Sequence, residues 1–296
     1  FKAVCTTISI KIIKIKRKNE MEKIAFADIV SETLLINLYF RSKENEEAKP
    51  ILKDEFSGDV ASRIDYDFAK FDRSTLSRVG TVIRARFFDD CILKFTREHP
   101  SAVIVQVGAG LDTRPLRLAP VCPEATFYDL DLPDVIALRD KLVPKAPRNY
   151  SLACSMLETA WMDELARKHA GAKFIFVLEG VAMYFEKAVF REFVLNLSER
   201  FEGLLLTDLI NKFAARSNAR KHDVLKFMKG DVKFKMSVEG ADEVEAWDKE
   251  RIKCLEIGTM TNMYKHRWGL IARMLGYIKP FREACRMFVF ALGKRG

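Results

Sequence analysis

The stretch Val103-Ile-Val-Gln-Val-Gly108-Ala-Gly110-Leu-Asp112-Thr-Arg114 decides the fold of this chain. Its first five residues form a short, apolar and mostly β-branched run, which is typical of a buried strand in a parallel sheet. The run leads directly into a turn with two glycines, where Gly108 permits a sharp change of direction and Gly110 lets the backbone approach a ligand closely. In open α/β sheets the crevice beyond the carboxyl end of such a strand binds the ligand.

Further strand-like runs follow, separated by helical stretches. The runs lie at residues 126–131, 150–153, 174–178 and 204–206, and the helical stretches between them at 134–142, 161–169 and 187–200. Strands that alternate with helices predict βαβ units and a doubly wound parallel sheet. Two late runs, 252–259 and 287–292, bracket a helical stretch at 267–275 and can close the sheet as an antiparallel pair.

The rest of the chain completes one α/β domain over residues 21–296. Residues 21–100 have helical periodicity, with one apolar face along 76–95, and we expect them to form a helical cover. Residues 101–210 are the expected cofactor-binding core. Residues 211–265 are polar, basic and mixed in pattern, and we expect a lid insertion there; residues 266–296 supply the closing helix and strand.

The turn and the next strand together indicate a nucleoside ligand. A dinucleotide fingerprint needs a third glycine at position 113, where this chain has Thr113. An NAD-dependent oxidoreductase is therefore the weaker alternative. The second strand ends Phe127-Tyr-Asp129-Leu-Asp131-Leu-Pro133, which places an acid about 20 residues beyond the glycines, where it can accept both hydroxyls of a ribose. A ribose acid without a pyrophosphate seat favours S-adenosyl-L-methionine.

Three motifs resemble one family. VQVGAGLDTRPLRL, FYDLDLPDV and VLEGVAMYF resemble the leucine carboxyl methyltransferase family, within it the bacterial branch of tetracenomycin-type polyketide O-methyltransferases. The resemblance runs from about Ser31 to Leu292. It implies a class I S-adenosylmethionine-dependent methyltransferase fold, a Rossmann-like doubly wound sheet of seven strands with a C-terminal antiparallel strand.

The resemblance also suggests cofactor-binding residues. It places the turn Gly108, Ala109 and Gly110 at the cofactor and Asp131 at the ribose, although Asp131 could instead cap the helix after Pro133. Glu179 would lie beside the methionine part of the cofactor, where negative potential favours the sulfonium and ammonium charges; pairing with an arginine is the alternative.

At several further positions the sequence leaves more than one role open. Arg86 resembles the family arginine that pairs with the cofactor carboxylate, but spacing does not settle whether Arg84 or Arg86 points inward. Ser155 and Met156 stand where relatives carry an Asp-Leu pair beside the adenine, so the carboxylate partner of the adenine is missing here. Tyr184 borders the acceptor pocket or packs in the core. Asp112 and Arg114 are expected to order the pocket or cap the next helix.

Charge and composition exclude several other classes. The net charge is +9, but residues 1–20 hold six Lys or Arg against one Glu, leaving 44 against 40 in the rest of the chain. We expect Met21 to be the natural start and residues 1–20 to be a non-native or disordered extension. The remaining excess is ordinary for an enzyme, so the alternative of a basic nucleic-acid or membrane-surface module is disfavoured and no such partner is expected. Six cysteines without C-x-x-C spacing and four unpaired histidines predict no metal site and a cytoplasmic location.

The sequence thus predicts an O-methyltransferase that uses S-adenosyl-L-methionine and transfers its methyl group to a carboxylate or hydroxyl of a small-molecule or peptide acceptor. A carboxylate acceptor is already ionised at neutral pH and requires no general base. No catalytic base is assigned for that reason, and Tyr184 is the first candidate if the acceptor is a hydroxyl.

Overall fold

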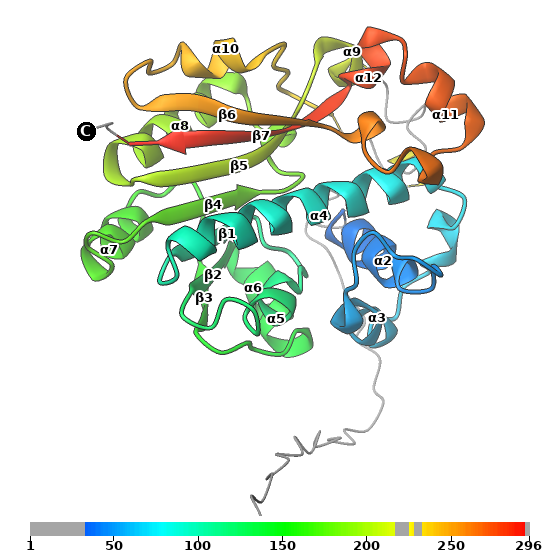
Figure 1. Ribbon diagram of the computed structural model, residues 1–296. Coiled ribbons are helices and arrows are strands. Elements are labelled where there is room, and N and C mark those ends of the chain that lie inside the picture. The colour runs from blue at the N-terminus through cyan, green and yellow to red at the C-terminus, as the bar shows by residue number, and fades with distance from the viewer. Residues whose placement is uncertain (1–32, 217–224, 228–232, 294–296) are drawn as a thin grey trace, which may run out of the picture.

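A seven-stranded sheet forms the centre of the computed structural model, which describes residues 33–216, 225–227 and 233–293 (Figure 1). The strand order is β3-β2-β1-β4-β5-β7-β6. The strands are β1 (Val103–Val107), β2 (Thr126–Asp131), β3 (Asn149–Ala153), β4 (Phe174–Leu178), β5 (Gly203–Ile210), β6 (Ile252–Thr259) and β7 (Cys285–Leu292). The strands from β3 to β5 pair in parallel, and β7 runs antiparallel to both of its neighbours, β5 and β6. The predicted doubly wound sheet with a C-terminal antiparallel strand is confirmed.

Helices cover both faces of the sheet because successive strand side chains point to opposite sides. In β1, Val103, Val105 and Val107 pack with α7 (Ala160–Lys168) and α8 (Lys187–Arg200). Ile104 packs on the other face with α4 (Thr75–Glu98) and α5 (Arg114–Leu118). Figure 1 shows α4 running across the front of the sheet. These two apolar layers form the main core.

A smaller group of helices covers the end of the sheet where β1 and β2 finish. It consists of α2 (Leu34–Glu44), α3 (Glu55–Ser62) and α6 (Pro133–Leu142), which pack around Leu111 of the glycine turn. The predicted helical cover is therefore present over its described part, residues 33–100, and it lies directly over the turn that follows β1. Residues 1–20 and the expected start at Met21 lie outside the described residues.

The region after β5 differs from the expected boundaries. Residues 211–265 were expected to be a lid insertion, but β6 lies inside that range and is the outermost strand of the sheet. Residues 211–251 carry α9 (Lys212–Ala215), a 3-10 turn (Leu225–Phe227) and α10 (Ala241–Glu245). The expected helix at 267–275 is interrupted, because Trp268 and Gly269 have extended backbones before α11 (Leu270–Leu275); α12 (Lys279–Arg282) follows.

Within the described residues, four other 3-10 turns connect the larger elements. They are Ala69–Phe71, Ala182–Tyr184, Met260–Asn262 and Lys265–Arg267. The last two approach α4, where Trp268 and Met260 pack against its apolar face. The C-terminal segment therefore returns to the same helix that the N-terminal cover contacts.

Candidate functional site

A cavity of about 310 Å³ lies beyond the carboxyl ends of β1, β2, β3 and β4. Because parallel strands end at a common edge, the segments that follow these four strands converge there. The cavity is lined by residues 107–112, 130–132, 154–156 and 179–181. Helix α2 lines a further side of it with Leu34, Asn37 and Arg41, together with Thr33, the residue just before the helix. Among the residues expected to bind the cofactor, it collects Gly108, Ala109, Gly110, Asp131, Ser155, Met156 and Glu179, but not Arg86.

The glycine turn is rigid and leaves no room for side chains. Gly108 and Gly110 have φ angles of +72° and +49°, a region that favours glycine. A Cβ atom on Gly108 would lie 2.5 Å from Cγ2 of Val181, which follows β4. The backbone N–H groups of Gly108 and Ala109 both donate to the carbonyl of Leu130 in β2, at 2.8 and 3.1 Å. The turn is thus fixed against both neighbouring strand ends.

Asp131 lies across the cavity from α2 and is held by two backbone groups. Its Oδ2 accepts from the N–H of Gly110 and its Oδ1 from the N–H of Leu132, both at 2.8 Å. Each carboxylate oxygen keeps a further lone pair for a ligand. Burial raises the pKa of Asp131 above its ordinary value. The side chain does not cap α6, whose N-cap position is Leu132.

Glu179 has one oxygen bound and one without a hydrogen bond. Its Oε2 accepts from Nη2 of Arg114 at 2.6 Å. Its Oε1 is buried without a hydrogen-bond partner, although Nε of Arg84 lies 3.3 Å away. A buried polar atom without a partner costs free energy unless a ligand supplies one. Pairing with arginine, the alternative for this residue, is therefore observed, and it leaves Oε1 available at the cavity wall.

The preference for Arg86 is corrected by the structure. Arg86 is partly exposed and pairs with Asp90 one turn further along α4, away from both cavities. Arg84 is buried, and its Nη1 donates to Oδ2 of Asp208 in β5 at 2.8 Å. At 3.6 residues per turn, positions two apart face opposite sides of a helix, so only one of the two could point inward. Although burial opposes the charge, Asp208 and Glu179 raise the pKa of Arg84.

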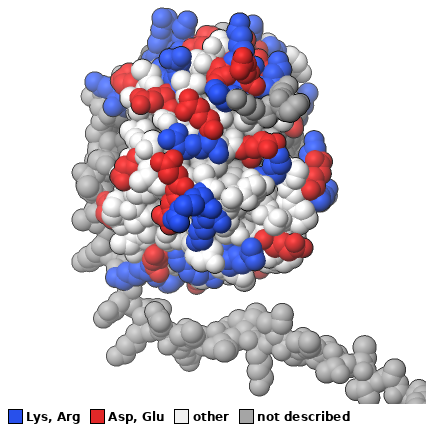
Figure 2. All heavy atoms as spheres, turned by 90° about the vertical axis from the view of Figure 1, so that its left-hand side faces the viewer, with Lys and Arg blue, Asp and Glu red and all other residues white. Residues whose placement is uncertain are grey.

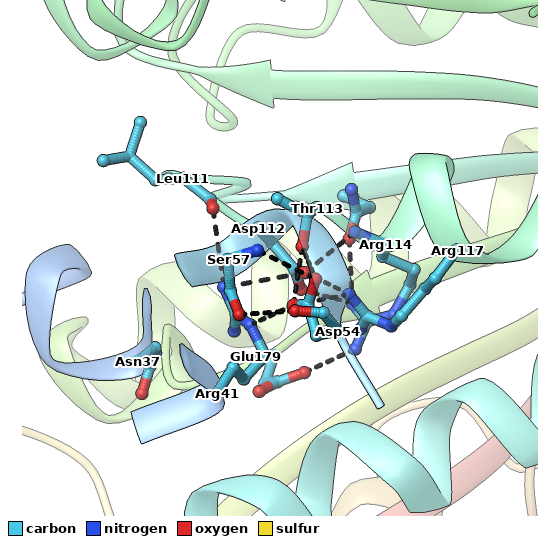
Figure 3. Close-up of polar contacts among 12 residues, drawn as sticks. Asn37, Arg41, Asp54, Ser57, Leu111, Asp112, Thr113, Arg114, Arg117 and Glu179 are labelled. Carbon is cyan, nitrogen blue, oxygen red and sulfur yellow. Dashed lines mark hydrogen bonds and ion pairs between the residues drawn. The ribbon is translucent and has the colours of Figure 1, made fainter. Parts of the chain in front are cut away.

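A dense network of ion pairs and hydrogen bonds surrounds residues 111–117, the segment that follows the glycine turn (Figure 3). Arg114 donates to Asp89, Gln106 and Glu179, at 2.7, 2.8 and 2.6 Å. The backbone N–H of Arg114, the first residue of α5, also donates to Oδ1 of Asp112 at 2.9 Å. Arg114, Arg41 and Arg117 hold the pKa of Asp112 well below its ordinary value, although its burial acts in the opposite direction. Glu179 is thereby oriented through Arg114.

Gln106 joins this network to a second one, and an acid could not do the same. Its Oε1 accepts from Arg114, while its Nε2 donates to Oδ1 of Asp129 at 2.6 Å. Asp129 also accepts from Arg139 and Asn149, both at 2.8 Å, so its oxygens are engaged within the protein. An amide carries both a donor and acceptors, whereas an ionised carboxylate only accepts.

Thr113, at the position where a dinucleotide fingerprint has its third glycine, is fully buried. Its hydroxyl donates to Asp54, with 2.6 Å to each carboxylate oxygen. Asp54 in turn binds Arg41 and caps α3. The side chain therefore fills the place where a third glycine would bring the helix close to a pyrophosphate, which disfavours a dinucleotide ligand.

The segment after β3 forms the apolar edge of the cavity. Met156 is buried and Leu132 half-exposed, and both side chains line the cavity. Oγ of Ser155 accepts weakly from the N–H of Leu157 at 3.3 Å, so its hydroxyl hydrogen remains free to donate. Cys154 donates its N–H to the carbonyl of Asp131, which joins this edge to the end of β2.

A second cavity of about 470 Å³ adjoins the first. The two share Thr33, Asn37, Gly180 and Tyr184, so Tyr184 lies at their boundary as well as in an aromatic cluster with Phe234. Burial raises the pKa of Tyr184. The second cavity is mainly apolar; its larger side chains are Ile36, Phe40, Leu76, Met183, Ile210, Phe213, Phe234, Met260, Trp268, Leu275 and Phe281. Its polar floor consists of Arg84, Asp208 and Cys285.

Four residues of the site were missed by sequence reasoning. Asn37 and Arg41 line the first cavity from α2, and Asp54 anchors the turn from the start of α3. All three come from segments distant in sequence, and no motif marked them. Asp208 had a signal, because it is an acid within the apolar run Gly203–Ile210. It accepts from Arg84 and, at 2.7 Å, from the N–H of Gly180.

Other kinds of site find little support in the described ranges. Within them no three His, Cys, Asp or Glu side chains gather as a metal site, and the five described cysteines are free thiols. No helix of these ranges is long and apolar enough to cross a bilayer. On the face in Figure 2, cations and acids are intermixed, so that face carries no continuous basic surface for nucleic acid.

Comparisons with known proteins agree with the site. Residues 36–196 match the leucine carboxyl methyltransferase family. The tetracenomycin polyketide synthesis O-methyltransferase of Streptomyces glaucescens is 33% identical over 159 residues, 54% of this chain and 57% of that protein. An S-adenosyl-L-methionine-dependent methyltransferase of Gibberella zeae, dpfgK, is 37% identical over 120 residues, 38% of this chain and 40% of that protein. The aligned part of the chain thus spans 57% of the first relative's length and 40% of the second's.

A crystal structure of a Thermobifida fusca protein assigned as a methyltransferase resembles this chain with a TM-score of 0.50 at 12% identity, over 87% of this chain and 94% of that one. This likeness supports the class I methyltransferase fold. The family match extends from α2 to α8 and includes the turn after β1, the acid after β2 and the glutamate after β4. Because it spans more than half of the sequence, the chain belongs to the leucine carboxyl methyltransferase family.

Proposed function

We propose that the chain is an S-adenosyl-L-methionine-dependent O-methyltransferase that acts on an apolar small molecule. The observation that carries the proposal is the pair of adjoining cavities, with the buried Oε1 of Glu179, which accepts no hydrogen bond, on the wall of the first. The first cavity has the size of a ligand pocket and the second supplies separate room for an acceptor. The names of the two curated relatives support the same chemistry.

The first cavity fits the nucleoside half of the cofactor. Asp131 presents one free lone pair on each oxygen, which suits the two ribose hydroxyls. Leu132 and Met156 provide an apolar edge for the adenine. Ser155 can donate its hydroxyl hydrogen to a ring nitrogen, in place of the acid that related proteins carry and this chain lacks.

The same cavity fits the methionine half. Oε1 of Glu179 can accept from the ammonium group and stabilise the nearby sulfonium. For the carboxylate, Arg84 takes the role first expected of Arg86. Its Nη2 lies beside Gly180 at the shared wall and makes only a long contact of 3.4 Å, to Asn37. That nitrogen therefore has a donor left for an anion.

When bound, S-adenosylmethionine supplies a methyl group on a positively charged sulfur for in-line transfer to an oxygen. The protein's own residues orient the reactants and exclude water. Tyr184 and Asn37 lie at the boundary of the two cavities, so they are placed to align the acceptor with the donor. Helix α2 closes the first cavity from above and limits its contact with water.

The acceptor group is a carboxylate rather than a hydroxyl. The titratable side chains among the described residues of the second cavity are Arg84, Tyr184, Asp208, Arg282 and Cys285. None is suited to act as a base: burial raises the pKa of Cys285 and Tyr184, and Asp208 is held in a buried ion pair with Arg84, whose charge favours the ionised, weakly basic carboxylate. An acceptor that is ionised before binding requires no base.

The five free thiols support a cytoplasmic location.

Calorimetry with S-adenosylhomocysteine tests the proposal. The wild-type chain is expected to bind this product, and Asp131→Ala to lose at least tenfold in affinity because both ribose contacts disappear, about 1.4 kcal/mol or more. Asp134→Ala, an exposed acid three residues further on, is the matched control and should bind as wild type. Absence of binding by the wild-type chain, or binding of NAD in its place, would overturn the proposal.

A further inference from the structure

The two short helices near the C-terminus carry a row of exposed apolar side chains. We define the α11–α12 surface by these side chains: Leu270, Ile271, Met274, Tyr277 and Ile278. Ile271 is 75% exposed and Tyr277 84% exposed. Figure 1 shows α11 and α12 together at the upper right, at the end of the molecule beyond β6. Single exposed apolar residues are common, but a contiguous group of this kind marks an interaction site.

Packing does not require this surface to be apolar. The inward side of the same helices already lines the second cavity, through Ala272, Leu275, Gly276 and Phe281. Leu270, Ile271, Met274 and Tyr277 point outward and belong to no buried cluster. Helix α11 is therefore apolar on both sides, one facing the cavity and the other facing solvent.

Cations surround the α11–α12 surface. Residues 265–286 contain six Lys or Arg and a single acid, Glu283. Glu283 pairs with Arg282 and Arg286, and Arg267 pairs with Glu44. Lys265, Arg273 and Lys279 are exposed, and in the described parts of the chain no acidic side chain pairs with them. The apolar row is thus bordered by three free positive charges.

We propose that the α11–α12 surface binds the surface of an anionic lipid bilayer. Apolar side chains bordered by lysine and arginine are the combination by which a peripheral segment inserts shallowly between acidic headgroups. The cytoplasmic leaflet supplies such headgroups. The charge excess alone did not favour a membrane in the sequence; the exposed apolar row among the free cations is what the structure adds.

Charge also favours a lipid surface over a second copy of the chain as the partner of the α11–α12 surface. A two-fold dimer through the α11–α12 surface would place the same patch on both sides and bring its free cations together. Acidic lipids instead complement them. The same helices line the second, apolar cavity. If the acceptor is the apolar molecule of the proposed function, binding at the bilayer would let it pass from the lipid phase into that cavity.

Vesicle flotation with the full chain tests this inference. The protein is expected to float with vesicles of equal parts phosphatidylcholine and phosphatidylglycerol, to float much less with phosphatidylcholine alone, and to release as salt is raised. The double variant Ile271→Gln with Tyr277→Ser should lose at least tenfold in binding, and so should Arg273→Gln with Lys279→Gln. All four positions are exposed, so the fold should be retained.

The matched control changes two exposed apolar residues elsewhere, Val121→Gln with Leu255→Gln, which are 64% and 58% exposed. It should float as wild type. Equal binding to neutral and anionic vesicles, no binding to either, or unchanged binding by the two double variants would overturn the inference. So would a vesicle-free dimer that the Ile271/Tyr277 variant abolishes. Calorimetric binding of S-adenosylhomocysteine should be unchanged in all variants, which separates this test from that of the proposed function.

Discussion

The guanidinium of Arg84 lies between two carboxylates, on the wall of the second cavity. It donates to Asp208, its Nε lies 3.3 Å from Glu179, and its Nη2 faces Gly180 at the shared wall. The planar fork lets one side chain satisfy Asp208 and keep a donor for a ligand. Lysine has the charge without this fork, so a charge-conserving substitution isolates the geometric contribution.

We predict that Arg84→Lys weakens the binding of S-adenosylhomocysteine by about tenfold, or roughly 1.4 kcal/mol. Arg86→Lys is the matched control two residues away, and it should change affinity little because Arg86 only pairs with Asp90 on the surface of α4. Titration calorimetry of both variants measures the difference. A larger loss in Arg86→Lys than in Arg84→Lys would contradict the placement of Arg84 at the ligand.

Protonation of Asp131 should make cofactor affinity depend on pH. Burial raises the pKa of this carboxyl above its ordinary value. As pH falls through that pKa, the carboxylate takes up a proton and loses acceptor capacity for the ribose hydroxyls, so affinity should decline on the acid side and stay level at neutral pH. The measurement is the dissociation constant across pH for the wild type and Asp131→Asn; the variant should lack this decline.

The same raised pKa links the stability of the fold to pH. Because burial favours the protonated form of Asp131, the protonated carboxyl stabilises the fold relative to the ionised one. This stabilisation is present at low pH and is lost as pH rises through the folded-state pKa. The stability of the wild type in thermal denaturation should therefore decline as pH rises through this pKa, whereas Asp131→Asn, which does not titrate there, should lack this decline. A wild-type stability that follows the same pH profile as the variant would contradict the raised pKa.

At the residue scale the sequence identified groups whose motif fixes their position. Asp131 and Glu179 each end a strand, and strand ends at one sheet edge must face the crevice, so both were predictable. The choice between Arg84 and Arg86 was not, because it depends on the rotation of α4 against β5, which is set by Asp208 across the fold. Ligand contacts remain predictions at all of these positions.

The turn after β1 is the element on which the site depends. We predict that Gly108→Ala destabilises the protein by about 2 kcal/mol or more and weakens cofactor binding, because its φ is +72° and the added Cβ would collide with Val181. Gly171→Ala is the control: its φ is +78°, but no atom lies within 4 Å of the added Cβ. It should cost only the backbone strain, about 1 kcal/mol.

Chemical denaturation of the two glycine variants separates strain from collision. Equal losses of unfolding free energy would show that Val181 yields to the new methyl group, and the account of a crowded turn would then fail. Binding of S-adenosylhomocysteine should remain normal in Gly171→Ala, since that residue lies in the loop before β4 and lines neither cavity.

Regular elements were predictable where the apolar pattern was strong. The runs at 103–107, 126–131 and 174–178 and the helix at 187–200 match the structure because buried strands and one-sided helices leave simple periodicities. The prediction of one helix over residues 267–275 is wrong, because α11 begins only at Leu270. There Trp268 turns back to donate to the carbonyl of Met263, and Gly269 starts a new helix, a tertiary effect that local pattern does not record.

At the scale of the whole molecule, a buried ion pair joins α2 to the segment before α11, where Arg267 pairs with Glu44 and also lies 3.3 Å from the half-buried Glu47. Both oxygens of Glu44 in α2 accept from Arg267, at 2.7 and 2.8 Å, and Glu44 is completely buried. It also accepts from the N–H of Ile51 at 2.6 Å. The pair fixes the cover of the first cavity to the segment that lines the second.

We predict that Glu44→Gln lowers the unfolding free energy by about 3 kcal/mol, because it leaves the guanidinium of Arg267 without its buried counter-charge. Glu46→Gln, which breaks an exposed pair with Lys43, should cost less than about 1 kcal/mol. Thermal and urea denaturation measure both variants. A loss in Glu44→Gln no larger than that of Glu46→Gln would show that the two segments are held together by other contacts.

The single doubly wound sheet was predictable from the alternation of strands and helices, but this long-range closure was not. Glu44 and Arg267 are separated by 223 positions, and each looks like an ordinary surface charge on its own. The same reason hides Asp54 beneath the glycine turn. Buried ion pairs between distant segments have no local sequence signature.

The position of β7 between β5 and β6 has a consequence for folding during synthesis. β7 follows both of its partners in the chain, so β5 keeps an open edge and β6 has no neighbour in the sheet until β7 has been made. A nascent chain that stalls between β6 and β7 exposes unpaired strand edges, which invite aggregation. The edge strand β6 therefore joins the sheet only after the strand inside it.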